Sequence, residues 1–257
     1  MKVTVLAENT TCAENVIAQH GLSLYLETGD LRILFDMGQS DAFIQNAQIL
    51  GVDLSKVDIA VLSHGHYDHG GGLEAFLQIN QKAPVYIHET AFGAYYNGTE
   101  KYIGLNLSLL GNPRLISTKG SLQLTPNLYL RDCNDLGWQF DSWGLTKWEG
   151  EVFSPDDFGH EQYLEIREGQ KRILVSGCSH KGILNIADHF QPDVLIGGFH
   201  LNKQDDPTVL KSIAQRLLGG NTRYFTGHCT GDKQFAIMKA IMVDRLEHVC
   251  TGMVLEV

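Results

Sequence analysis

The stretch Leu62-Ser63-His64-Gly65-His66-Tyr67-Asp68-His69-Gly70-Gly71-Gly72-Leu73 places four side chains that can bind a metal within six residues. It overlaps the end of a short apolar run, Val57–Ser63, which is typical of a buried strand. A loop that leaves the end of a strand can turn such side chains toward one point, and the glycines let the backbone turn tightly there. Three imidazoles and a carboxylate suit zinc, and also iron or manganese. The stretch therefore predicts a metal centre at the end of a strand.

On both sides of this motif the N-terminal half contains mostly strand patterns. A turn at Thr28-Gly29-Asp30 joins two of the strands into a hairpin. Two segments instead have apolar residues at helical spacing or end at a helix stop signal. Strands are expected at Lys2–Glu8, Leu22–Glu27, Arg32–Asp36, Val57–Ser63 and Pro84–His88, and helices at Asp41–Leu50 and Gly72–Asn80.

The C-terminal half repeats this order, with strands first and then alternating strands and helices. Strands are expected at Gln162–Arg167, Arg172–Ser176, Asp193–Gly197 and Arg223–Thr226, and helices at Ile183–Phe190, Thr208–Leu218 and Asp232–Leu246. Two similar halves of this kind predict an α+β fold, a four-layer αββα sandwich with two sheets inside and helices outside. We expect one domain over residues 1–257, with an aromatic-rich insertion at about 93–150 that contains all three tryptophans.

Composition limits the class of protein. The chain has 20 Lys and Arg against 30 Asp and Glu, a net charge of −10, whereas nucleic-acid binding usually leaves a basic footprint. No apolar run approaches the roughly 20 residues of a membrane span. The five cysteines are scattered and odd in number, which favours a reducing compartment over a disulfide framework. We therefore expect a cytoplasmic protein with a small-molecule substrate, and neither a nucleic-acid nor a membrane partner.

The motif also resembles that of a known family. The hexapeptide His64–His69 is similar to the metal-binding motif of the metallo-β-lactamase superfamily, and Phe35-Asp36-Met37-Gly38 resembles its upstream Asp-x-Gly motif. Residues 62–73, GCSHKGILNI (177–186), GGFHL (197–201) and TGHCTG (226–231) together look like one subfamily, the dihydropterin-phosphate synthase-like metal-dependent hydrolases. The similarity covers most of the chain and is weakest between residues 93 and 150. It implies the same αββα sandwich, with metals at one edge between the sheets.

The resemblance implies two metal ions, with zinc expected and manganese or iron as alternatives. The first ion would be bound by His64 and His66, and the second by Asp68, His69 and His228. The third ligand of the first ion has two candidates. His180 follows the strand Arg172–Ser176 and is our choice. His160 is the competitor, because Phe158-Gly159-His160 precedes a strand much as the third motif of the superfamily does.

Two positions near the ligands have other expected roles. Many members of the superfamily have a bridging Asp where this chain has Cys178, so that either a thiolate binds the metal or the bridge is missing. Asp36 is expected to hold the metal-binding loop by hydrogen bonds rather than to bind metal. The number of ions, two or one, depends on what Cys178 does.

The expected chemistry is hydrolysis by a metal-activated water. Asp68 is expected to take the proton of that water, and His180, His200 or His160 to donate one to the leaving group. The subfamily name implies a phosphorylated, pterin-like substrate, and we expect a small phosphorylated or cyclic ester. Two alternatives stay open: an iron-dependent oxidoreductase on the same site, and a non-catalytic metal- or ligand-binding protein.

Substrate contacts are also expected from the insertion and from isolated cations. An aromatic lid on which a flat ring stacks would use Trp138, Trp143 and Trp148 together with Tyr95, Tyr96 and Tyr102. Candidates for meeting a phosphate are Lys181, Arg131 and Lys147.

Overall fold

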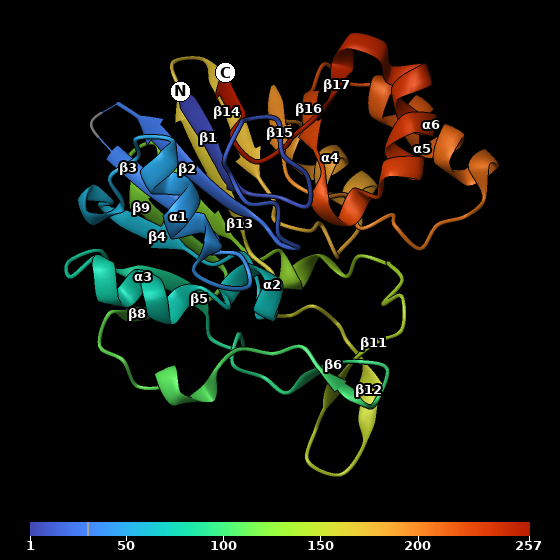
Figure 1. Ribbon diagram of the computed structural model, residues 1–257. Coiled ribbons are helices and arrows are strands. Elements are labelled where there is room, and N and C mark those ends of the chain that lie inside the picture. Colours follow the sequence, from blue (N-terminus) through green and yellow to red (C-terminus); the bar gives the residue numbers. More distant parts are fainter. Residues whose placement is uncertain (30) are drawn as a thin grey trace.

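The computed structural model describes residues 1–29 and 31–257, in which two seven-stranded sheets pack face to face (Figure 1). The first sheet consists, in spatial order, of β18 (Val254–Glu256), β1 (Lys2–Ala7), β2 (Ser23–Thr28), β3 (Leu31–Phe35), β4 (Ile59–Val61), β5 (Val85–His88) and β8 (Leu115–Thr118). The second consists of β17 (Leu246–His248), β16 (Arg223–Thr226), β15 (Val194–Ile196), β14 (Lys171–Val175), β13 (Tyr163–Glu168), β10 (Leu128–Arg131) and β9 (Ser121–Thr125).

Helices lie on the outer face of each sheet. The first sheet is covered by α1 (Ala42–Ile49) and α3 (Leu73–Ile79), and the second by α4 (Ile183–Phe190), α5 (Pro207–Leu218) and α6 (Asp232–Met242). A one-turn helix, α2 (Tyr67–Gly70), lies within the histidine motif, and single 3₁₀ turns occur at Leu54–Lys56, Leu107–Leu109, Asn134–Leu136, His228–Thr230 and Val243–Arg245. The protein is thus the αββα sandwich that the sequence pattern predicts.

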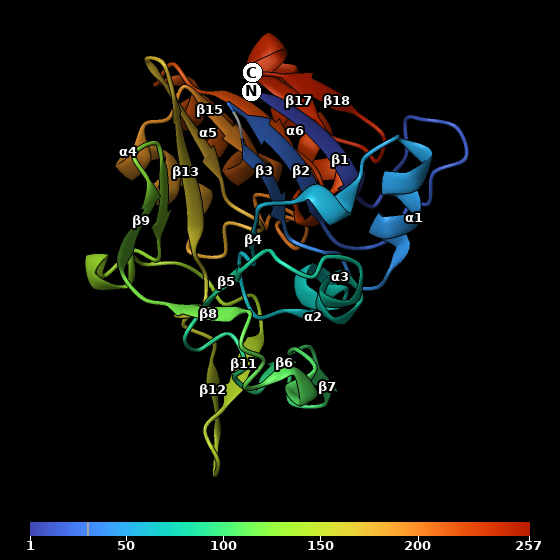
Figure 2. The same ribbon diagram turned by 90° about the vertical axis from the view of Figure 1, so that its left-hand side faces the viewer.

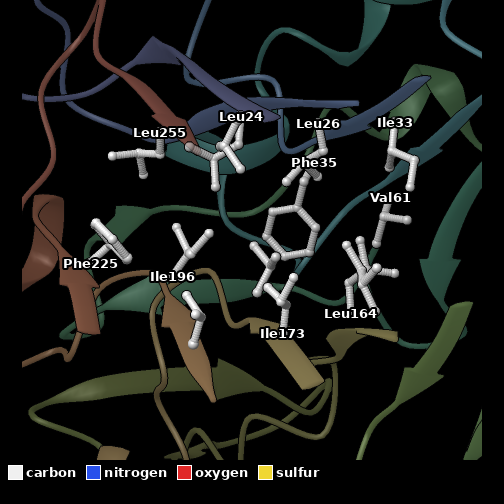
Figure 3. Packing of buried hydrophobic residues seen from close by; sticks show 14 of the residues in the cluster. Leu24, Leu26, Ile33, Phe35, Val61, Leu164, Ile173, Ile196, Phe225 and Leu255 are labelled. Atoms are coloured by element: carbon white, nitrogen blue, oxygen red, sulfur yellow. The ribbon is translucent and has the colours of Figure 1, made fainter. Parts of the chain in front are cut away.

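Three apolar layers hold the sandwich together. The central layer lies between the sheets and contains side chains from both, among them Phe35 and Val61 from the first and Ile173 and Phe225 from the second (Figure 3). An outer layer joins the first sheet to α1 and α3, and another joins the second sheet to α4, α5 and α6. Burial of this apolar surface is the main source of stability for such a fold.

The residues from 93 to 150 do not form one separate unit. Within them, β8 joins the first sheet, and β9 and β10 join the second. A third, four-stranded sheet is made of β12 (Phe153–Pro155), β11 (Leu145–Trp148), β6 (Tyr95–Asn97) and β7 (Lys101–Tyr102). This small sheet projects from the end of the sandwich at which α2 lies (Figures 1 and 2).

Two C-terminal strands differ from the sequence expectation. The helix expected over Asp232–Leu246 ends at Met242, and β17 begins at Leu246, because Val243 adopts a left-handed φ of 44° that stops the helix. The last strand, β18, was not expected; it pairs with β1 and closes the edge of the first sheet. Both strands have only three residues, which is too short for an alternating pattern to show.

The two sheets bring their strand ends to one edge of the sandwich. In the first sheet β3, β4 and β5 are parallel, and in the second β14, β15 and β16 are parallel. The carboxyl ends of parallel strands meet at the same edge, where ligand sites of α/β sheets gather. The segments that follow these strands contain the residues singled out from sequence, namely Asp36, His64–His69, Cys178, His200 and His228.

One expectation about the cysteines is wrong. Cys12 and Cys250 form a disulfide across a Cα–Cα distance of 5.7 Å. A sequence separation of 238 residues hides this pairing, but β1 and β18 lie side by side and bring the two segments together. The bridge removes the argument for a reducing compartment that the scattered cysteines supplied. Across residues 1–29 and 31–257, no helix is both long and apolar enough to cross a membrane.

Candidate metal centre

A buried carboxylate, Asp36, holds the histidine motif in place through hydrogen bonds. Asp36, fully buried at the end of β3, accepts hydrogen bonds from the Ser63 backbone N–H and from the Ser63 hydroxyl, each at 2.7 Å. It also accepts one from His69 Nδ1 at 2.6 Å, and His64 Nδ1 lies 2.8 Å from the Ser63 hydroxyl. With their Nδ1 atoms engaged, both imidazoles are left with Nε2 pointing to the other side, which is how a carboxylate orients metal-binding histidines.

The first group of donor atoms lies around His64. Its Nε2 atom is 3.3 Å from Nε2 of His180, and the ring of His66 lies 4.6 Å from His64 and 5.0 Å from His180. His66 Nε2 and His180 Nδ1 are buried without a hydrogen-bond partner among the described residues. Burial lowers the pKa values of His64 and His180, so both are neutral imidazoles, the form that binds metal. The His64 and His180 nitrogens therefore face one another, and the His66 ring lies beside them with its Nε2 atom 3.8 Å from Asp156 Oδ2.

His160 lies behind this group. Its Nδ1 atom accepts a hydrogen bond from the Gly65 backbone N–H at 2.9 Å, and its Nε2 atom lies 3.2 Å from Asp156 Oδ2. Burial lowers the pKa of His160 to about 4. Both of its nitrogens already have partners that hold the motif loop, so the geometry favours His180 over His160 as the neighbour of His64.

The second group of donor atoms lies around His69 and His228, whose Nε2 atoms are 3.2 Å apart. Asp68 Oδ2 lies 3.3 Å from His228 Nε2 and 3.2 Å from Nε2 of His20. Burial alone would raise the pKa of Asp68, but the hydrogen bonds to His20 and His228 outweigh it and hold that pKa well below its usual range. Asp68 is therefore an ionised carboxylate beside two imidazoles.

Cys178 lies between the two groups. Its Sγ atom is 3.1 Å from His69 Nε2, and it falls within 4.8 Å of the donor atoms of both the His64–His180 pair and the His69–His228 pair. Burial raises the pKa of the thiol well above its ordinary value, so without a cation beside it the sulfur stays protonated. The side chain thus occupies the place where the superfamily resemblance predicted a bridging residue.

His200 faces the same space with an unusual backbone. Its φ is 48°, a left-handed value that is uncommon outside glycine and often found at functional sites. The ring lies 4.1 Å from that of His180, and both ring nitrogens are buried without a partner among the described residues. This places a free imidazole beside the first group of donors.

Two glutamates that support the site were not anticipated from sequence. Glu8 accepts a hydrogen bond from the His228 backbone N–H, and Glu161 accepts one from the His180 backbone N–H at 2.7 Å. Asn9 Oδ1 lies 3.1 Å from His228 Nδ1. Both glutamates are fully or almost fully buried, and a carboxylate directly after a strand end or a histidine is the only sequence signal that could have indicated them.

The expected phosphate contacts lie elsewhere. Lys181 is buried, and its ammonium group donates to the Asn134 side chain at 2.7 Å and to the backbone oxygens of Asp132 and Glu161. Arg131 pairs with Glu165, and Lys147 with Asp157. These three cations are therefore already neutralised or enclosed. None of them lines the cavity at His66, Asp68 and His228, which we call the metal cavity.

The aromatic lid is also only partly as expected. Trp138 packs against His189, and Trp148 packs against Phe153 in the small sheet. Trp143, in contrast, lines a cavity of about 290 Å³ together with Phe140, His180 and His200. A smaller cavity of about 130 Å³ opens directly onto His66, Asp68 and His228 and also has His180 and His200 in its lining. The two cavities share those two histidines.

With this geometry in place, comparison with known proteins identifies the family. The model of the metallo-beta-lactamase superfamily matches residues 17–228, so the chain belongs to that superfamily. A curated relative from Methanocaldococcus jannaschii, 7,8-dihydropterin-6-methyl-4-(beta-D-ribofuranosyl)-aminobenzene-5'-phosphate synthase, is 29% identical over 91% of this chain and 88% of its own length. An uncharacterized protein of the same organism is 29% identical over 90% of this chain and 91% of its own.

A solved structure agrees over the whole length. Tm1679, described as a metal-dependent hydrolase of the beta-lactamase superfamily, is 28% identical, with a TM-score of 0.84 over 100% of this chain and 99% of that one. The sandwich is thus shared with a protein described as a metal-dependent hydrolase.

Proposed function

We propose that the protein is a metal-dependent hydrolase with two divalent cations. His64, His66 and His180 would hold one ion, and Asp68, His69 and His228 the other, with Cys178 between them. The donor atoms of His64, Cys178 and His180 lie within 4.8 Å of one another, as do those of His69, Cys178 and His228. The observation that supports this most strongly is the pair of facing Nε2 atoms in each group, His64 with His180 and His69 with His228, at 3.3 and 3.2 Å. Two lone pairs aimed at one point make a binding site for a cation.

The donor set fits such ions chemically. Imidazole nitrogens, one carboxylate and one thiol are the ligands that zinc prefers, and manganese or iron would also accept the nitrogens and the carboxylate. Buried polar atoms nearly always have partners, yet His66 Nε2 and His180 Nδ1 have none among the described residues. The Nε2 atom of His66 is thus free to face a ligand, whereas His180 would bind through Nε2 and its unpartnered Nδ1 atom lies on the other side of the ring.

The residues around the ions define how water and protons would be handled. When bound, the cations would lower the pKa of a water molecule and polarise the bond under attack. Asp68, held ionised by His20 and His228, is placed to accept the proton of that water. His200, whose two nitrogens lack partners, is placed to donate a proton to the leaving group. His180 serves as a ligand and leaves this role to His200.

The substrate that we propose is a small phosphorylated or cyclic ester with a flat ring. The cavity lined by Phe140 and Trp143 shares His180 and His200 with the metal cavity, so a ring stacked there would lie next to the reacting bond. The name of the curated relative, a synthase of a pterin-linked phosphate, supports a ring and a phosphate in the same molecule. That name also supports a second candidate, a synthase reaction on a phosphorylated pterin-like compound.

The test uses metal-loaded protein with three ester classes: a phosphomonoester, a phosphodiester and a lactone. The account predicts turnover of at least one class, its loss on chelation, and its return with zinc or manganese. His200→Asn should lower kcat about 100- to 10,000-fold, the usual contribution of a general acid. His189→Asn, an exposed histidine on another face, is the matched control and should leave kcat unchanged. No turnover of any ester, with conversion of a pterin phosphate instead, would favour the synthase.

A further inference from the structure

Two lysines line the metal cavity without a carboxylate partner among the described residues. The lining includes Lys101, from β7 in the small sheet, and Lys203, from the segment after His200. Across residues 1–29 and 31–257, neither ammonium group lies within ion-pair distance of a carboxylate, whereas Lys82, Lys119 and Lys147 are all paired. In a chain of net charge −10, unpaired cations at a cavity are the exception.

Lys101 is tied to the histidine motif by its backbone. Ile103, two residues further on, accepts a hydrogen bond from the Tyr67 backbone N–H at 2.8 Å. Tyr67 lies between His66 and Asp68, and the Lys101 ammonium group is 5.4 Å from the centre of the Tyr67 ring. The position of Lys101 is therefore linked directly to the residues that would bind metal.

Lys203 is tied in the same way to the other side of the second donor group. The backbone N–H groups of Leu201 and Asn202 both donate to the Cys229 carbonyl at 3.1 Å, and Cys229 follows His228. The Lys203 ammonium group donates to the Trp143 carbonyl at 2.6 Å, which holds it at the boundary with the ring cavity. The two lysines thus belong to segments that are hydrogen-bonded to Tyr67, which precedes Asp68, and to Cys229, which follows His228.

The cavity has little negative charge of its own to neutralise them. Among its lining residues the only carboxylate is Asp68, which His20 and His228 already engage. The remaining polar lining includes the side-chain amides Asn97 and Asn202, which can donate to oxygen. A group with several negative oxygen atoms would satisfy these donors.

We propose that Lys101 and Lys203 bind an anionic group of the substrate, a phosphate or a carboxylate, that lies apart from the bond being broken. The assignment rests on the proposed function, because it places a substrate at the metal cavity. It narrows the substrate class to esters with a second, negatively charged group, and it makes neutral esters and simple lactones poor substrates. A lysine is a point charge without a planar fork, so it accepts either anion.

The test measures binding, not turnover, by calorimetry on the metal-loaded protein. Propylphosphonate has one anionic group, whereas 3-phosphonopropanoate and 1,2-ethylenediphosphonate each have two. The wild type should bind the two-anion ligands at least about tenfold more tightly, the size expected of a charge-assisted contact. In the Lys101→Ala/Lys203→Ala double variant this preference should fall to nearly one. The better of the two ligands shows whether the group is a carboxylate or a phosphate.

Matched variants separate this idea from its alternatives. Lys119→Ala/Lys147→Ala removes two lysines from a different cavity and should keep the preference, and Lys101→Arg/Lys203→Arg should also keep it because the charge remains. An unchanged preference in the alanine double variant, or no preference in the wild type, would overturn the proposal. A lysine-dependent preference in a protein that hydrolyses none of the esters would leave this proposal standing and reject only the hydrolase function.

Discussion

A large cavity lined by His88, Lys119 and Lys147 and the small metal cavity differ in how their polar groups are satisfied. The large one has about 1260 Å³, roughly ten times the 130 Å³ of the other. Several of its ionisable groups are paired: Lys119 with Glu89, Lys147 with Asp157, and His88 with Asp132. In the metal cavity, by contrast, imidazole nitrogens lack partners and two lysines lack carboxylates within residues 1–29 and 31–257. Polar groups without partners, more than the volume of the cavity, distinguish the candidate site.

The contrast between the two cavities can be tested first by removing one histidine from each. His66→Ala should lower turnover about 1000-fold or more, because it removes a proposed metal ligand. His189→Ala, which removes an exposed histidine from the large cavity, should change turnover less than about twofold. Steady-state kinetics on both variants, with circular dichroism to confirm folding, is the measurement. Equal activities in the two variants would contradict the contrast between the cavities.

The disulfide gives the next largest effect. The Cys12–Cys250 bridge holds the segment between β1 and β2 that contains Asn9 and His20, both of which touch the metal cluster. Replacing Cys12 by Ser should lower the free energy of unfolding by about 2–4 kcal/mol, as for other native disulfides. Urea unfolding with and without a reducing agent measures it. The Cys12→Ser variant should show no dependence on the reducing agent, whereas the control Cys133→Ser, which keeps the bridge, should respond to it as the wild type does.

Two aspartates with similar surroundings sharpen the comparison further. Asp36 below the metal cavity and Asp132 at the large cavity each accept hydrogen bonds from a histidine and from a backbone N–H. Asp36→Asn should weaken metal affinity about 10- to 100-fold, because His69 loses the carboxylate that orients it. Asp132→Asn should leave metal affinity unchanged. Competition with a chromophoric chelator measures both affinities. A larger loss of metal affinity in Asp132→Asn than in Asp36→Asn would contradict this assignment.

The smallest effect concerns acid stability. Burial alone would raise the pKa of Asp132, but hydrogen bonds from His88 and from the Asn134 and Gly120 backbone outweigh it and lower that pKa. A carboxyl with a lowered folded-state pKa stabilises the fold above its unfolded value of about 3.9. That stability is lost as the pH falls toward the folded value. The stabilities of wild type and Asp132→Asn in thermal unfolding should therefore differ at pH 7, and the difference should shrink progressively as the pH falls below about 4. A constant difference would exclude this cause.

Much of the site followed from where strands end. The motif at His64–His69 comes after β4, and Cys178, His200 and His228 come after β14, β15 and β16, so a parallel arrangement had to bring them to one edge. The pattern of the chain indicated those strands because buried parallel strands are short apolar runs.

The remaining features depend on contacts between distant segments. The Cys12–Cys250 bridge and the hydrogen bond from His228 to Glu8 join opposite ends of the chain, and no local pattern encodes them. Lys181 looked available for a phosphate beside His180, yet its neighbour Glu161 and the segment after β10 enclose it. No sequence motif marks Lys101 and Lys203 as binding residues. They stand out only in the folded protein, where neither has a carboxylate partner among the described residues.

The most direct test of the two-ion centre is its metal content, measured by elemental mass spectrometry on protein purified without a chelating column. The account predicts about two ions of zinc or manganese per chain in the wild type, and about one in His180→Ala, with His160→Ala retaining two. A well-folded wild-type protein without metal, or a His180→Ala variant with its metal content unchanged, would contradict it.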